Sequence, residues 1–107
     1  MKMITAIVNK EDTGSVCRAL TEAGFSFTKL ATTGGFLMSG NTTIMVGVDE
    51  EKVQTVIDLI RECCHSRKEM IPTATDVSYG YYSTMPVEVT VGGATIFVVD
   101  IERFERV

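Results

Sequence analysis

The segment from Thr28 to Gly47 holds the groups best suited to binding a small ligand. Gly34-Gly35 gives a backbone that can approach a ligand closely and offer free N–H groups, and Phe36 beside it is an apolar plate. A purine nucleotide needs such parts: a flat surface, main-chain groups for the base edge, and neutral polar groups for phosphate. Hydroxyl and amide side chains are clustered in the same segment: Thr28, Thr32, Thr33, Asn41, Thr42 and Thr43.

The same composition also occurs in an ordinary glycine-rich turn flanked by threonines of high β-propensity, and the residues alone leave both interpretations open. Catalysis would need a convergent set of groups, but His65 is the one histidine and no acid pair accompanies a nucleophile. Cys63 and Cys64 are adjacent, so they cannot easily share a tetrahedral metal. We therefore expect a binding protein rather than an enzyme, with no metal and no cofactor.

Charge and cysteine content limit the setting in which this protein works. The chain has 107 residues, a net charge of −4 and three cysteines. An acidic balance argues against binding a nucleic-acid polymer or a membrane surface, since both need a basic face. The apolar stretch after Met1 is too short for a signal peptide or a membrane span, and the odd cysteine count argues against a disulfide framework. We expect a cytoplasmic protein.

Three strands and two helices are predicted in the first two thirds of the chain. Branched and apolar residues predict strands at Met3–Val8 and Asn41–Val48, and alternation predicts a half-buried strand at Phe25–Leu30. Asp12 is expected to cap the first helix and Asp49 the second, because a side-chain oxygen there can accept from the first N–H groups. Helical spacing predicts two buried stripes, Val16, Ala19, Leu20 and Ala23 before Gly24, and Val53, Val56, Ile57 and Ile60.

The last third of the chain combines an irregular stretch with a predicted hairpin. The stretch Ser66–Pro86 contains prolines, a glycine and a tyrosine cluster, and is expected to be a long loop. Val87–Val91 and Ala94–Val99 alternate on either side of Gly92-Gly93, which predicts two paired strands.

The resulting order, βαββαβ with an extra hairpin strand, predicts one α+β ferredoxin-like domain over residues 1–107. Its antiparallel sheet would carry both helices on one face. The strands contain more apolar residues than two helices can cover, so we also expect the chain to oligomerise.

Several motifs resemble those of the cyclic-di-AMP receptor proteins, a PII-like family. They are Thr28-Lys29-Leu30-Ala31-Thr32-Thr33-Gly34-Gly35-Phe36-Leu37, Gly40-Asn41-Thr42-Thr43, Gly47-Val48-Asp49, Pro86-Val87-Glu88-Val89, and Val91-Gly92-Gly93-Ala94-Thr95-Ile96-Phe97-Val98. The resemblance implies a homotrimer that binds cyclic di-AMP between neighbouring subunits and relays its presence to a protein target through loop changes. It implies no catalysis.

The resemblance also assigns roles to individual residues. Thr28 and Asn41 match the polar contacts to the ligand, and Gly47 matches a point of close approach. Phe97 would lie near the other side of the pocket. The loop against an adenine is matched by Gly35, Phe36 and Leu37.

Two positions depart from the pattern of that family. Ser26 stands where members carry arginine, and Arg106 stands where a neutral polar residue is usual. Without that arginine, a charge-assisted bond to the ligand's phosphates is lost, unless another cation reaches the site. Arg106 is the candidate for this cation. A PII-like receptor for another adenine nucleotide, such as ATP, is therefore the alternative function.

Overall fold

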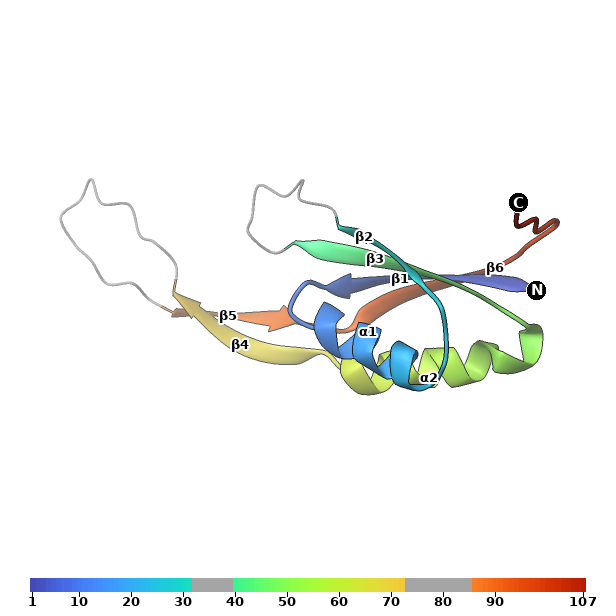
Figure 1. The fold of residues 1–107 in the computed structure, drawn as a ribbon. Helices are drawn as coiled ribbons and strands as arrows, with labels where there is room; N and C mark the ends of the chain where they lie inside the picture. Colours follow the sequence, from blue (N-terminus) through green and yellow to red (C-terminus); the bar gives the residue numbers. More distant parts are fainter. Residues whose placement is uncertain (32–39, 73–85) are drawn as a thin grey trace.

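The computed structural model describes residues 1–31, 40–72 and 86–107, and these form two helices, a short 3-10 turn and six strands (Figure 1). In chain order the elements are β1 (Lys2–Asn9), α1 (Thr13–Glu22), β2 (Thr28–Ala31), β3 (Asn41–Val48), η1 (Glu50–Lys52), α2 (Val53–Cys63), β4 (Arg67–Pro72), β5 (Pro86–Val91) and β6 (Ala94–Asp100).

Four strands form an antiparallel sheet in the order β2-β3-β1-β6. The two helices cover one face of this sheet (Figure 1). Strand β1 lies between β3 and β6, so the first and last strands of the chain are neighbours. This α+β arrangement is the ferredoxin-like fold, and the predicted fold class is confirmed.

The core lies between the sheet and the helices. Alternate residues of β1 and β3 point into it, and each helix contributes residues at helical spacing. Its fully or nearly fully buried members are Ile4, Ala6, Val8, Val16, Leu20, Ile44, Val46, Val48, Val56, Ile60 and Cys64. The predicted stripes are confirmed at Val16, Leu20, Val56 and Ile60, whereas Ala23 at the end of α1 is exposed.

The two ends of helix α1 differ in how well the sequence predicts them. Gly24 adopts φ +85°, and its N–H donates to Thr21 O at 3.0 Å while the N–H of Phe25 donates to Leu20 O at 2.9 Å. This pair of bonds ends the helix, as predicted. The side chain of Asp12, in contrast, makes no capping hydrogen bond, so the predicted cap is wrong. Its carboxylate pairs with Arg67 instead.

The start of the second helix also differs from the prediction. Asp49 precedes the 3-10 turn η1 rather than α2, and its side chain makes no capping hydrogen bond. Strand β2 is shorter than the predicted Phe25–Leu30, because residues 25–27 form no strand. Phe25 and Phe27 nevertheless pack against the core, which explains their apolar character.

The predicted hairpin across Gly92-Gly93 is wrong in its pairing. Strand β5 pairs with β4 in a separate two-stranded ribbon, and β6 pairs with β1. Gly92 and Gly93, at φ +84° and +77°, carry the chain from one sheet to the other. The ribbon β4–β5 projects beyond the four-stranded sheet (Figure 1).

The long loop predicted over Ser66–Pro86 is also wrong at its beginning, because residues 67–72 form β4. The mixed charged and apolar residues of this strand do not show the alternation typical of a half-buried strand. Residues 73–85 lie outside the described residues. Within the described part of the chain, neither helix is long and apolar enough to cross a membrane.

Burial makes the Cys64 thiol a stabilising group whose contribution depends on pH. Cys64 is 2% exposed, and burial, aided by Asp12 and Cys63 and opposed by Arg67, raises its pKa from 9.0 to about 12. The unfolded chain therefore releases this proton first. The contribution of the Cys64 thiol to the free energy of unfolding is fully present below about pH 9. It decreases as pH rises towards 12, by at most about 1.4 kcal/mol per pH unit.

Urea unfolding of the wild type and of Cys64→Val at pH 8 and pH 10.5 measures this dependence. The variant keeps a buried apolar group but has no thiol, so it should lose less stability between the two pH values. Equal losses in the two proteins would contradict the assignment.

Candidate ligand-binding site

The face of the sheet opposite the helices carries most of the described candidate residues. We call it the open face. It carries Thr5 of β1, Met45 of β3 and Phe97 of β6, together with every second residue from each of these along its strand. In the strand register, Thr28 is opposite Met45, Met45 is opposite Thr5, and Thr5 is opposite Phe97. Residues opposite one another in an antiparallel sheet point to the same face. Thr28 and Phe97 therefore lie in one row at opposite edges of the open face.

Two further described candidates, Asn41 and Gly47, share this face. Along β3, Asn41 and Gly47 are each an even number of residues from Met45, so all three point to the same face. The register partner of Gly47 is Met3, and that of Asn41 is Asn9. The open face thus brings Thr28, Asn41, Gly47 and Phe97 onto one surface. Gly35, Phe36 and Leu37 lie outside the described residues, between the end of β2 and the start of β3.

No contact within the described chain requires a glycine at position 47. A Cβ there would lie 3.8 Å from Ile101 Cδ1, which is an ordinary contact, and the backbone is not in the left-handed region. Gly47 is also exposed. A reason for its small size would have to come from outside the described residues, and the close approach of a ligand is one such reason.

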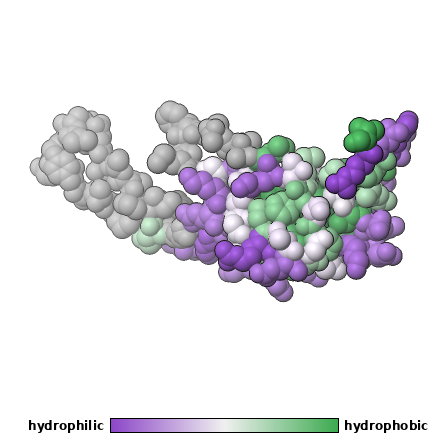
Figure 2. All heavy atoms as spheres, in the orientation of Figure 1, coloured by the Kyte–Doolittle hydropathy of each residue, from purple (hydrophilic) through white to green (hydrophobic). Residues whose placement is uncertain are grey.

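The open face is also apolar. Phe97 and Val99 are 54% and 55% exposed, and Leu30 on β2 is about equally exposed. Figure 2 has the orientation of Figure 1, which looks along the sheet rather than onto the open face, and it shows apolar surface in the middle of the molecule with polar side chains around it. The apolar residues of the strands are thus divided between two faces: Ile44, Val46 and Ile96 point towards the helices, whereas Phe97 and Val99 remain uncovered.

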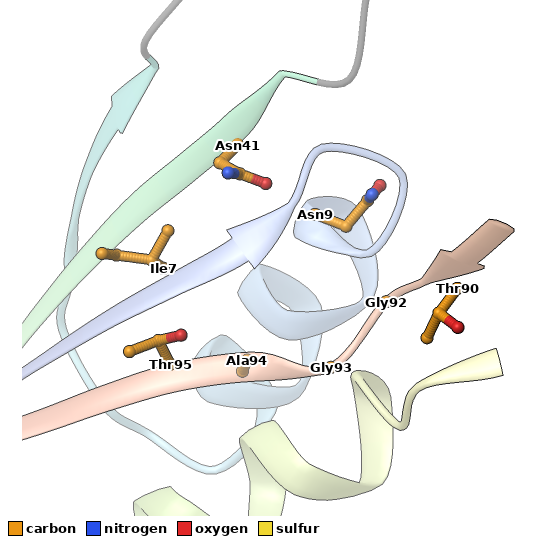
Figure 3. Close-up of a pocket in the computed structure, with 8 residues that line it drawn as sticks. All are labelled: Ile7, Asn9, Asn41, Thr90, Gly92, Gly93, Ala94 and Thr95. Atoms are coloured by element: carbon orange, nitrogen blue, oxygen red, sulfur yellow. The ribbon is translucent and has the colours of Figure 1, made fainter.

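A pocket of about 470 Å³ opens where the open face meets the base of the ribbon (Figure 3). Its lining residues are Ile7, Asn9, Asn41, Thr90, Gly92, Gly93, Ala94 and Thr95. Asn41 is the predicted site residue among them, and the amides and hydroxyls around it are neutral hydrogen-bonding groups. Asn9, Thr90 and Thr95 were missed by sequence reasoning. The signal that could have found Asn9 is its place directly after the predicted strand Met3–Val8, and the structure sets it opposite Asn41.

The remaining two candidates lie at the other end of the sheet. Ser26 is exposed and precedes β2 by two residues, while Arg106 is exposed in the segment that follows β6. These two strands form opposite edges of the sheet. Within one chain, Ser26 thus precedes one edge strand of the sheet and Arg106 follows the other.

The protein-family model described as "Cyclic-di-AMP receptor" matches residues 1–107. This chain belongs to the cyclic-di-AMP receptor family. The family is one of receptors rather than enzymes. A crystal structure of a functionally unknown protein from Pediococcus pentosaceus is similar to this family member, with 38% sequence identity and a TM-score of 0.74. The match covers 99% of this chain and 96% of that one.

Proposed function

We propose that this protein is a homotrimeric, PII-like receptor that binds cyclic di-AMP between neighbouring copies of its open face. The observation that carries the proposal is the row from Thr28 to Phe97. These residues occupy the two outer strands, β2 and β6, so three strand spacings, roughly 14 Å, separate them. Thr28 of one copy and Phe97 of a neighbouring copy can contact the same part of one ligand, whereas within one copy they are too far apart to do so.

This geometry favours a closed ring. A contact between the β2 side of one open face and the β6 side of the next is heterologous, and such contacts generate rings when the rotation closes. The exposed Phe97 and Val99 supply the apolar surface for this contact. Three copies would then enclose three equivalent sites.

The described polar groups suit an adenine dinucleotide. Thr28 and Asn41 provide neutral donors and acceptors, and Gly47 leaves room for a close approach. Gly35, Phe36 and Leu37 would lie against an adenine. The receptor would act without a cofactor or catalysis, in the cytoplasm, and pass the ligand's presence to a protein target through changes in its loops.

Calorimetric titration with cyclic di-AMP, cyclic di-GMP and ATP tests this proposal. We expect one cyclic di-AMP per chain. Cyclic di-GMP should bind at least about tenfold more weakly, because mispaired buried polar groups cost about 1–3 kcal/mol each. Tighter binding of ATP would instead identify a receptor for that nucleotide, and absence of binding to all three would refute the proposal.

A further inference from the structure

The first residue of the ribbon holds the turn between β1 and α1. Arg67 Nη2 lies 3.2 Å from Asp12 Oδ1, and Nη1 lies 3.4 Å from Asp12 Oδ2, so the guanidinium engages both oxygens. Glu11 Oε2 lies 3.5 Å from the same Nη2. The Asp12 side chain is only 9% exposed. Two-point pairing of this kind fixes orientation as well as distance.

The same turn is attached to the candidate site. The N–H of Lys10 donates to Gly40 O at 3.0 Å, directly before β3 begins at Asn41. The N–H of Glu11 donates to Asn9 Oδ1 at 2.8 Å, and Asn9 lines the pocket. The turn that contains Asp12 is therefore hydrogen-bonded to Asn9, which lines the pocket, and to Gly40, which precedes the pocket residue Asn41.

Arg67 also packs behind the opposite wall. A Cβ at Gly92 would lie 2.7 Å from Arg67 Nη1 and 2.8 Å from His65 O, so the guanidinium occupies space that only glycine leaves free. Gly92, Gly93 and Thr90 all line the pocket. The structure thus places one side chain in contact with both the turn at Asp12 and the backbone that joins the ribbon to β6.

We propose that Arg67 and Asp12 form a clamp that positions the pocket wall at Thr90–Gly93 and couples ligand in the pocket to the orientation of the ribbon. The ligand part rests on the proposed function. The Arg67–Asp12 clamp joins both walls of the pocket. A ligand that draws the two walls together therefore strengthens the Arg67–Asp12 pairing, and the ribbon is held more firmly. Arg67 and Asp12 are positioning residues, which act through the wall and need not touch the ligand.

Hydrogen exchange without ligand tests the clamp itself. Arg67→Gln and Asp12→Asn should each raise exchange at amides 90–93 by about tenfold, because local opening becomes easier when the pair is lost. Arg67→Lys should retain part of the protection. Lys68→Gln is the matched control, since Lys68 pairs with Glu88 across the same ribbon at 3.6 Å and both side chains are largely exposed. Asp12→Asn keeps the test available if Arg67→Gln does not fold.

The coupling is tested by adding cyclic di-AMP. In the wild type and in Lys68→Gln, ligand should slow exchange across residues 86–93. In Arg67→Gln, affinity should fall by about tenfold and this slowing should disappear, as linkage between pocket and ribbon requires. If the wild type binds no cyclic di-AMP, the proposed function fails while the ligand-free comparison still decides the clamp. Equal exchange in Arg67→Gln and Lys68→Gln would overturn the clamp whatever the ligand.

Discussion

Replacing Phe97 by aspartate is expected to leave the chain folded but to separate the trimer and abolish cyclic-di-AMP binding. Phe97 is 54% exposed on the open face, so the core does not depend on it. In the trimer, an aspartate there would bury a charge against an apolar surface, which is costly when the charge is unpaired. Light scattering should report three chain masses for the wild type and one for Phe97→Asp.

Val98 provides the matched control for this experiment. It is the next residue of β6, is 42% exposed, and pairs with the buried Ile4, so it points to the helix side of the sheet. Val98→Asp introduces the same charge one residue away and should leave the trimer and binding in place. A monomeric wild type, or a trimeric Phe97→Asp that still binds ligand, would refute assembly through the open face.

Ser26→Arg is expected to tighten cyclic-di-AMP binding by about 5- to 150-fold. Ser26 is exposed two residues before Thr28, and an arginine there would add a charge-assisted bond worth about 1–3 kcal/mol if a phosphate lies within reach. Ser15→Arg, at an exposed position of α1 on the helix side, is the control for added charge alone. Calorimetry should show tighter binding only for Ser26→Arg.

Arg106 decides whether this chain already supplies the missing cation. Arg106→Ala should weaken binding to a similar degree only if the tail of one copy reaches the site. The loss should then shrink in a protein that carries Ser26→Arg, because two cations at one phosphate are not additive. If neither substitution changes the dissociation constant, the phosphates are held by main-chain and neutral groups, and the role given to both positions is wrong.

Local patterns predicted the elements better than their partners. Gly92 and Gly93 adopt positive φ, as a two-residue hairpin would require, yet they lead from the ribbon to the edge of β1. The backbone conformation was thus readable from the sequence. The pairing was not, because it depends on which strand edge is free in the assembled sheet, and β1, which offers that edge to β6, lies at the other end of the sequence.

Asp12 shows the same limit for a side chain. Its position before a helix predicts a cap, but Arg67, 55 residues further along the chain, takes its carboxylate instead. For the site, the alternation along β3 was enough to place Asn41 and Gly47 on one face. The contribution of Thr90 and Thr95 to the pocket depended on where the ribbon joins the sheet, which no local pattern indicates.

A crystal structure of the protein grown with cyclic di-AMP would show on which face of the sheet, and between which copies, the dinucleotide binds. We expect a trimer with the dinucleotide on the open face, in contact with Thr28 and Asn41 of one copy and near Phe97 of the next. A dinucleotide bound on the helix side, or held entirely within one chain away from the open face, would contradict it.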